Sequence, residues 1–203
     1  MTFSFTEGHS DPTVQPVPAS VVQQVDAADT TLSNPRRAVI SIGANLGNRL
    51  ETLQGAIDAL EDTPGVRIKA VSPVYETEPW GVEPGSQPSY FNAVVVLKTT
   101  LPPSSLLERA HAVEEAFHRV REERWGARTI DVDIVAYADV VSDDPVLTLP
   151  HPRAHERAFV LAPWHDVEPA AQLPGRGPVA ILLDTVTRDG VAPRKDLELR
   201  LPE

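Results

Sequence analysis

The alternation of apolar and polar residues predicts a series of strands and helices that begins near residue 36. A short, mostly apolar run at Ala38–Ile42 ends at Gly43 and is typical of a buried strand. Apolar residues then recur every three or four positions between 50 and 60, which predicts one apolar face of a helix. Asn48 and Glu51 stand at capping-box spacing, so the helix is expected to begin there.

Three further strands and a second helix follow with patterns of the same kinds. The expected strands are Val66–Ala70, continuing towards Tyr75, then Tyr90–Thr99 and Thr129–Tyr137, and the helix opens at Pro102. Right-handed crossovers on this strand–helix–strand–strand–helix–strand order give a ferredoxin-like α/β (βαββαβ) sandwich. Additional strands and helices are expected at the C-terminal end, including helices over 155–164 and 179–186.

The distribution of proline and of small polar residues divides the chain into three parts. Residues 1–35 contain four prolines among small and polar residues, which predicts a disordered N-terminal extension. Residues 36–187 carry the periodic patterns and are expected to form the folded domain. Residues 188–203 are expected to be a loose C-terminal tail.

Composition and charge exclude several classes of protein. The 203 residues suffice for a core, and the absence of cysteine removes disulfides, thiolate metal sites and cysteine nucleophiles. No apolar run approaches the roughly 18 residues of a membrane span, and the N-terminus lacks signal-peptide features, so we expect a cytoplasmic protein without a membrane partner. A formal net charge of −11 argues against a nucleic-acid partner, although a phosphate ligand needs only a local basic patch.

Two carboxylates separated by one residue, Asp131 and Asp133, are the sharpest chemical feature of the sequence. Strand side chains alternate between faces, so both carboxylates are expected to project from the same face. Two adjacent negative charges repel each other, and a bound Mg²⁺ ion would remove that cost with hard oxygen ligands. The alternative is a pair of solvated aspartates on an open strand face.

The segment before that strand is rich in arginine. Residues 119–128 hold four arginines, with Trp125 and Gly126 among them, in a chain that is acidic overall. Guanidinium groups match phosphate oxygens, so arginines beside a carboxylate pair favour phosphoryl-transfer chemistry. A helix end with cations placed for its dipole is the alternative, and it explains Arg119 and Arg121 better than Trp125 and Arg128.

Other polar residues are less informative taken singly. His151 could touch a phosphate or a metal, but a histidine between two prolines is more often a residue of a rigid turn. Asn92 lies within a strand, where its amide either pairs with backbone or reads the edge of a heterocycle. The glycine-containing segment 43–47 lacks the spacing and the lysine of a P-loop, and no nucleophile signature of a covalent enzyme is present.

Several motifs in order resemble one known family, that of 6-hydroxymethyl-7,8-dihydropterin pyrophosphokinases of folate biosynthesis. The most specific is the string RWGARTIDVDI at 124–134. The other matching segments are Ile42–Gly47, Tyr75–Gly81, Tyr90–Val94, Pro150–Arg153 and Arg157–Val160. The resemblance covers about residues 38–175.

The resemblance implies a monomeric, Mg²⁺-dependent enzyme with a ferredoxin-like α/β fold. Members of the family move a pyrophosphoryl group from ATP to the hydroxymethyl oxygen of 6-hydroxymethyl-7,8-dihydropterin and release AMP. By position, two Mg²⁺ ions would be held by Asp131 and Asp133. The segment between Arg121 and Trp125 is one residue shorter than in the best-known members, which affects the register of Arg119 and Arg121.

The same resemblance assigns roles to three further groups of residues. The catalytic loop residues would be Arg119, Trp125 and Arg128. The ATP site would be lined by Glu114, Arg121, Arg124, Ile134, Thr148, His151 and Arg157. The pterin would be held by Thr77, Trp80, Tyr90, Asn92 and Phe159.

Two other functions remain open from the residues themselves. One is a two-metal phosphohydrolase that uses the same aspartate pair. The other is a non-catalytic ferredoxin-like binding module, which would need a basic or aromatic sheet face where this sequence has two aspartates.

Overall fold

The computed structural model describes residues 34–79, 87–117 and 129–202. The expected N-terminal extension, residues 1–35, lies almost wholly outside the described residues. So do Trp80 and the arginine-rich segment 119–128.

A six-stranded sheet is the centre of the fold. Its strands are β1 (Arg36–Ala44), β2 (Val66–Val71), β3 (Tyr75–Thr77), β4 (Tyr90–Thr99), β5 (Asp131–Tyr137) and β8 (Val191–Pro193). The order is β5-β1-β4-β3-β8, with β2 also paired to β4, and neighbouring strands run antiparallel. Two helices each connect parallel strands across an intervening one, which is the split βαβ arrangement of the expected ferredoxin-like fold.

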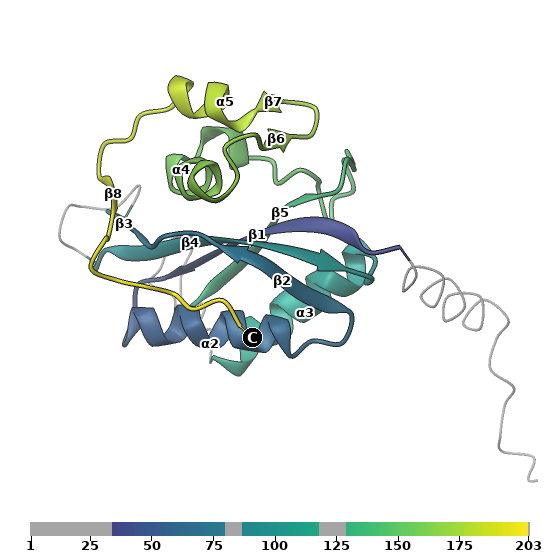
Figure 1. Ribbon diagram of the computed structural model, residues 1–203, viewed down its shortest axis with the longest axis horizontal. Coiled ribbons are helices and arrows are strands. Elements are labelled where there is room, and N and C mark those ends of the chain that lie inside the picture. Colours follow the sequence, from purple (N-terminus) through teal and green to yellow (C-terminus); the bar gives the residue numbers. More distant parts are fainter. Residues whose placement is uncertain (1–33, 80–86, 118–128, 203) are drawn as a thin grey trace, which may run out of the picture.

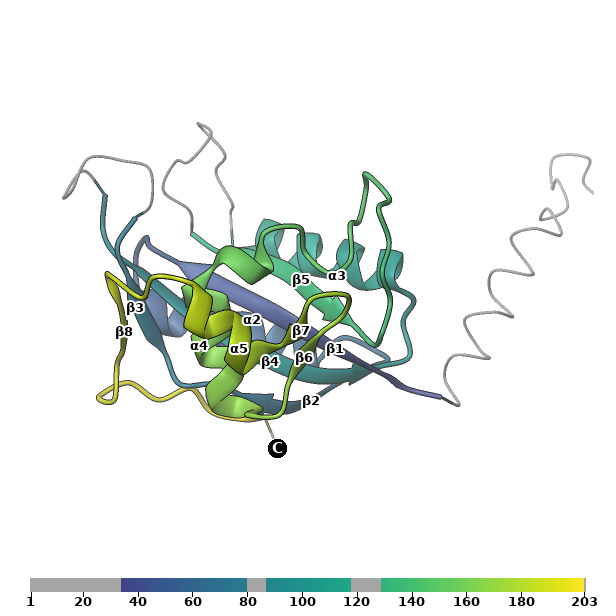
Figure 2. The ribbon, with the colours of Figure 1, turned by 90° about the horizontal axis from the view of Figure 1, so that it is seen from above.

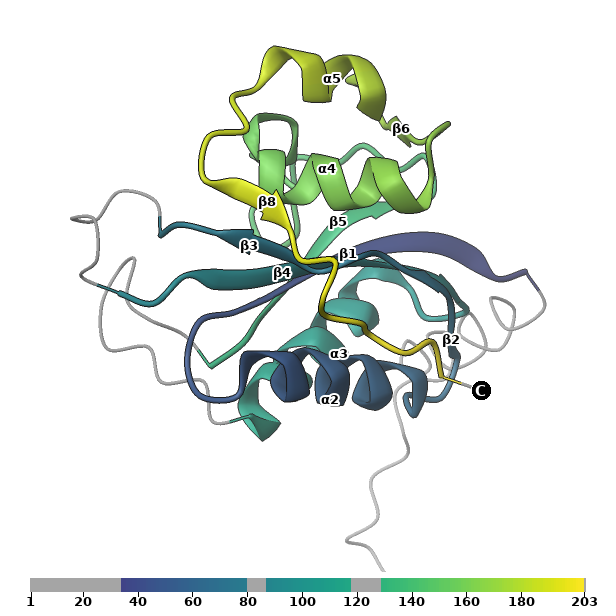
Figure 3. The same ribbon diagram turned by 60° about the vertical axis from the view of Figure 1, so that its left-hand side comes forward.

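Helices cover both faces of this sheet (Figure 1). On one face lie α2 (Arg49–Glu61) and α3 (Pro103–Ala116). On the other lie a 3₁₀ turn, η1 (Ala154–Glu156), the helices α4 (Ala158–Val167) and α5 (Val179–Thr185), and the two-stranded ribbon of β6 (Gln172–Leu173) and β7 (Gly177–Pro178). Figure 3 shows the three resulting layers, with the sheet between the two helical layers.

The alternation of side chains along β1 divides the core into two parts. Ile40 and Ile42 are fully buried against α2 and α3, whereas Val39 is fully buried on the side of α4 and α5. Both faces of the central strands are therefore buried, which explains why β1 and β4 contain long apolar runs and not an alternation of apolar and polar residues.

The expected helix start at residue 48 is confirmed. Asn48 is the N-cap of α2, and its side-chain oxygen accepts a hydrogen bond from the backbone N–H of Glu51. The expected strand at Tyr90–Thr99 is β4 with the same bounds. The helix expected over 179–186 is α5.

The strand expected to continue from Val66 towards Tyr75 is instead two strands, β2 and β3, both paired with β4. The break falls at Ser72 and Pro73. The hydroxyl of Ser72 accepts a hydrogen bond from the N–H of Val94, and Pro73 has no N–H to continue the ladder. The strand β3 is therefore separate from β2, although both strands pair with β4.

The expectation of a loose tail over 188–203 is wrong. Residues Val191–Pro193 form β8 on the outer edge of β3, and Leu197 and Leu199 pack against the core beneath the sheet. The main-chain N–H of Arg200 donates to the side chain of Gln54 in α2 at 2.8 Å. The strand β8 is held by backbone hydrogen bonds, which do not depend on the type of side chain. Three residues are also too few to show a periodic pattern, so the sequence did not reveal this edge strand.

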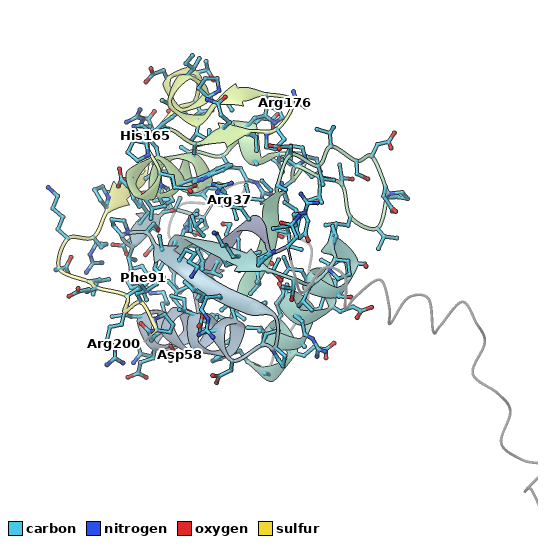
Figure 4. The ribbon with its side chains drawn as sticks, turned by 45° about the vertical axis from the view of Figure 1, so that its right-hand side comes forward. Arg37, Asp58, Phe91, His165, Arg176 and Arg200 are labelled. Atoms are coloured by element: carbon cyan, nitrogen blue, oxygen red, sulfur yellow. The ribbon has the colours of Figure 1, made fainter. Side chains whose placement is uncertain are left out.

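A charged cluster ties α4 to the sheet. Arg37 of β1 donates to both carboxylate oxygens of Glu168, and the indole N–H of Trp164 donates to the same carboxylate at 2.9 Å. Figure 4 shows Arg37 between the sheet and the upper helical layer. Burial would raise the pKa of Glu168, but the hydrogen bonds from Arg37 and Trp164 outweigh it and hold that pKa below its usual value.

Replacement of this carboxylate, Glu168→Gln, is expected to lower the free energy of unfolding by about 1 kcal/mol at pH 7. Because the native pKa is depressed, the stabilisation is fully present above the unfolded pKa of about 4.3 and is lost as the pH falls through the native pKa. Urea unfolding of both proteins from pH 7 to pH 3 measures the difference. A difference that stays constant over that range would contradict this account.

Candidate active site

The register of three strands places Asn92, Gly43 and Asp131 in one row across the sheet. Gly43 of β1 pairs with Asn92 of β4 on one side and with Asp131 of β5 on the other. The side chains of this row lie on the sheet face that carries α4, opposite the face of Ile42 and Phe91. Gly43 has no side chain, so the amide and the carboxylate face each other across a bare strand.

The second aspartate lies one step along the same face. Asp133 pairs in register with Ser41, and its Oδ2 lies 3.4 Å from Nη1 of Arg157 and 3.9 Å from Nε2 of His151. The expectation that both carboxylates share one face is met by this register. Within the described residues, no group of three or more His, Cys, Asp or Glu side chains is placed to hold a metal ion.

Burial shapes the charges beside the aspartate pair. It lowers the pKa of His151 to about 4, and the nearby Arg157 acts in the same direction, so the imidazole is neutral at pH 7. Its 3.9 Å approach to Asp133 is therefore a polar contact, not an ion pair. The ring is fixed because its Nδ1 accepts a hydrogen bond from the backbone N–H of Arg153 at 3.1 Å.

Burial also lowers the pKa of Arg157, while the neighbouring Asp133 and Asp131 raise it and only partly offset that effect. The guanidinium remains a cation, since the ordinary arginine pKa is above 12. Arg157, at the start of α4, thus places a fixed positive charge next to the carboxylates. The guanidinium carbon of Arg157 lies 5.6 Å from the ring centre of Phe159.

A buried glutamate supports β5 from the opposite side. Glu114 of α3 is 3% exposed, and its Oε1 accepts a hydrogen bond from the N–H of Val132 at 2.9 Å. Among the strands of the described residues, β5 is at the edge of the sheet, so that N–H has no strand partner there on its outer side. Glu114 therefore anchors the residue between the two aspartates.

A pocket of about 260 Å³ opens beside the aspartate pair. Its walls come from α3, β5 and the loop that follows β5, and they combine apolar side chains with a few polar groups. The lining residues are Leu107, His111, Glu114, Val132, Asp133, Ile134, Pro145, Val146, Leu147, Thr148, His151 and Pro152. Four residues that the sequence assigned to an ATP site, Glu114, Ile134, Thr148 and His151, are thus brought to one cavity, with Arg157 beside it.

The residues assigned to the pterin gather at the other end of the same row. Asn92 is 5% exposed, and its Nδ2 donates to Oγ1 of Thr77 at 2.8 Å. Thr77 pairs in register with Tyr90, and Phe159 of α4 is half-buried above this face. The threonine fixes which way the amide points, which leaves Oδ1 on the side of Gly43, where an added Cβ would meet it at 2.6 Å.

Six residues assigned from the sequence lie outside the described residues: Trp80, Arg119, Arg121, Arg124, Trp125 and Arg128. Two features of the site were not found from the sequence. One is the part played by Gly43, which depends on strand register. The other is a cluster on the opposite face, made of Arg49, Glu76, Ser89, Phe91 and Arg194, which brings together residues up to 145 positions apart. The spacing of these residues along the chain gives no signal for such a cluster.

Comparison with known proteins shows which family the chain resembles. The family model for 7,8-dihydro-6-hydroxymethylpterin-pyrophosphokinase (HPPK) matches residues 39–169. A 2-amino-4-hydroxy-6-hydroxymethyldihydropteridine pyrophosphokinase from Mycobacterium tuberculosis is 42% identical over 186 residues, covering 82% of this chain and 95% of that protein. A relative of the same name from Pseudomonas aeruginosa is 39% identical over 156 residues, covering 77% and 95%.

A solved structure shares the fold. Plasmodium falciparum HPPK-DHPS with pteroate superposes with a TM-score of 0.60 at 15% sequence identity, over 75% of this chain and 44% of that one. This chain thus spans less than half the length of that two-part protein. In the described parts of the chain, no helix is long and apolar enough to cross a membrane.

Fold and site together define a ferredoxin-like α/β protein whose sheet presents a carboxylate pair beside a pocket. The chain belongs to the 7,8-dihydro-6-hydroxymethylpterin-pyrophosphokinase family.

The support of β5 by Glu114 can be tested by stability measurements. Glu114→Ala leaves the N–H of Val132 buried without its acceptor and is expected to cost about 1–3 kcal/mol in the free energy of unfolding. Glu114→Gln keeps an oxygen acceptor and is expected to cost less. The exposed neighbour provides the control, and Glu115→Ala is expected to change stability by no more than about 0.5 kcal/mol. Equal losses for Glu114→Ala and Glu115→Ala in urea unfolding would contradict the assignment.

Proposed function

We propose that this chain transfers the pyrophosphoryl group of ATP to the hydroxymethyl group of 6-hydroxymethyl-7,8-dihydropterin, with release of AMP, in folate biosynthesis. The observation that carries the proposal is the row Asn92–Gly43–Asp131. Adjacent strands lie about 4.8 Å apart, so roughly 10 Å separates the strand of the amide from the strand of the carboxylates. A flat ring held at Asn92 would therefore extend a substituent over Gly43 towards the aspartate pair.

The pterin side of the row suits a heterocycle rich in hydrogen-bonding groups. The amide of Asn92 is nearly buried and is oriented by Thr77, so it presents a fixed donor–acceptor edge. Tyr90 and Phe159 supply aromatic surface from β4 and α4. Trp80 is assigned to the same subsite by the sequence resemblance.

The nucleotide side is the pocket beside the carboxylates. We assign the adenosine part of ATP to this cavity because its walls combine apolar side chains with polar groups that can bind a heterocycle and a sugar. The polar groups are His111, Glu114, Asp133, Thr148 and the neutral His151. Arg157 lies 3.4 Å from Asp133, which is part of the pocket lining, and would contact phosphate oxygens.

The two carboxylates fit Mg²⁺. This ion commonly takes one or two carboxylates, with phosphate oxygens and water completing its shell, and Asp131 and Asp133 provide such a pair on one strand face. We propose that they hold two Mg²⁺ ions together with the phosphates of ATP. Bound there, the metal would neutralise charge that grows on phosphate oxygens during transfer.

In the proposed step, the hydroxymethyl oxygen of the pterin forms a bond to the β-phosphorus of ATP. The bond from that phosphorus to the oxygen bridging to the α-phosphorus breaks, and AMP leaves with that oxygen and its electron pair. The hydroxyl proton passes to solvent. Asn92 and Thr77 orient the acceptor for in-line attack, and Arg157 stabilises the charge on the phosphates.

The arginine-rich segment completes the proposal from the sequence resemblance. We assign Arg119 and Arg128 to the transferring phosphates, Arg121 and Arg124 to ATP, and Trp125 to the closure that excludes water. We further propose that the enzyme acts as a monomer in the cytoplasm.

The test is a nucleotide-release assay on the wild type and on Asp133→Asn. The wild type is expected to release AMP only when Mg²⁺ and the reduced pterin are both present. Asp133→Asn is expected to lose at least about a hundredfold in turnover while it unfolds at a similar temperature. Asp139→Asn, an exposed aspartate just after β5, is the matched control and is expected to turn over normally. Release of ADP or phosphate, or loss of ATP without pterin, would point to a phosphohydrolase and overturn the proposal.

A second test addresses Gly43, the residue without a side chain between Asn92 and Asp131. Gly43→Ala would bring a methyl group to 2.6 Å from Oδ1 of Asn92, so the amide must move away from its hydrogen bond to Thr77. We expect the KM for the pterin to rise roughly tenfold, the equivalent of one hydrogen bond, while the KM for ATP changes less than about twofold. Thr77→Val, which removes the acceptor that orients the amide, is expected to show the same selectivity. Equal changes in both KM values would contradict this account.

A further inference from the structure

The C-terminal segment adds both a strand and a charged side chain to the edge of the sheet beside the pterin residues. In β8, Ala192 pairs in register with Glu76 of β3. The N–H of Arg194 then donates to the carbonyl of Val74 at 2.8 Å, and the N–H of Glu78 donates to the carbonyl of Gly190 at 3.1 Å. The three-residue strand β3 is thus held on both edges, by β4 and by β8. Figure 2 shows β8 beside β3, with β5 and α3 towards the opposite edge of the sheet.

The guanidinium of Arg194 bridges two carboxylates. Its Nε and Nη2 donate to Asp196 at 2.9 and 2.7 Å, and its Nη1 donates to Oε2 of Glu76 at 2.6 Å. Asp196 therefore orients the guanidinium group of Arg194, and the remaining nitrogen, Nη1, points towards Glu76 of β3. A lysine ammonium has one nitrogen and cannot reproduce this double engagement.

Glu76 connects this arginine to the start of β4. The hydroxyl of Ser89 donates to Oε1 of Glu76, and Nη1 of Arg49 donates to both the hydroxyl and the carbonyl of Ser89 at 2.7 Å. The guanidinium carbons of Arg49 and Arg194 lie 3.6 and 5.3 Å from the ring centre of Phe91. Hydrogen bonding to Ser89, followed by the contact with Arg194, holds the pKa of Glu76 below its usual value despite partial burial, so the carboxylate is charged at pH 7.

Two residues of this cluster are direct neighbours in sequence of residues assigned to the pterin. Glu76 directly precedes Thr77, and Ser89 directly precedes Tyr90, so the cluster fixes the backbone on both sides of the segment 78–88. Since strand side chains alternate, Glu76 and Phe91 face α2, whereas Thr77 and Asn92 face α4. The cluster therefore acts on the pterin residues through the backbone of β3 and β4.

We propose that Arg194 is a positioning residue for the pterin subsite, acting through Glu76 and Ser89; this inference rests on the proposed function. Its effect is expected to be selective, because β1 and β4 separate β3 from the ATP-side strand β5 in the strand order β5-β1-β4-β3-β8. A loss of Arg194 should let β3 and the start of β4 shift while the pocket next to β5 keeps its shape.

The experiment compares equilibrium binding of two ligands to Arg194→Ala, Arg194→Lys and the wild type, well below the unfolding temperature. The ligands are a non-hydrolysable ATP analogue with Mg²⁺, and 6-hydroxymethyl-7,8-dihydropterin added in the presence of that analogue. Arg194→Ala is expected to raise the Kd of the pterin about five- to tenfold and to change the Kd of the analogue less than about twofold. Arg194→Lys is expected to lie between the wild type and Arg194→Ala.

Arg200→Ala is the matched control within the same segment. The contacts of Arg200 with Gln54 use its main-chain N–H and carbonyl, so the substitution keeps them. Figure 4 shows Arg200 at the lower edge of the molecule, with its side chain pointing outward. Both Kd values are expected to match those of the wild type.

A double-mutant cycle tests the route through Glu76. Glu76→Gln is expected to weaken pterin binding in the same selective way, and adding Arg194→Ala to it should produce little further loss. The inference would be overturned by an unchanged pterin Kd in Arg194→Ala, by equal weakening of both ligands, or by additive effects in the cycle. A wild type that binds the analogue but not the pterin would overturn the proposed function, and this inference with it.

Discussion

Strand β1 lies between β4 and β5, and its pairing register with these two strands decides which side chains meet at the site. Because side chains alternate along a strand, a slip of one residue would turn every side chain of the slipped strand to the other face. In the observed register, Ile40 and Ile42 enter the core under α2 and α3, and Gly43 stands between Asn92 and Asp131. Burial of apolar side chains on both faces thus fixes the register, and the register aligns the polar row.

The electrostatics of the site are local and differ from those of the whole chain. The net charge of −11 is unfavourable for an anionic substrate, but the side chains near Asp133 include the cation of Arg157 and the neutral imidazole of His151. Both side chains lie close to the 3₁₀ turn and the beginning of α4, which pack on the sheet through Val160, Leu161 and Trp164. The stability of this second helical layer, including the contact between Arg37 and Glu168, therefore supports the placement of Arg157.

Strand β3 shows how a short element of the sheet can leave little trace in sequence. Three residues cannot hold their own position, and β3 is kept in place by β4, by β8 and by the side chain of Glu76. The same strand carries Thr77, which orients Asn92. The C-terminal segment, which looked like a tail by composition, is thereby part of the support of the site.

The sequence by itself determined the main elements, the fold class and the family. The apolar period of α2, the apolar run of β4 and the Asp131–Asp133 spacing depend on neighbours in the chain, and those are written directly in the residue order. Tertiary structure alone decided the pairing of Gly43 with Asn92 and Asp131, the neutral state of His151, the Val132–Glu114 hydrogen bond and the bridge from Arg194 to Glu76. The physical reason is that each of these depends on strand register or on burial among residues distant in the chain, and neither leaves a periodic pattern in a single sequence.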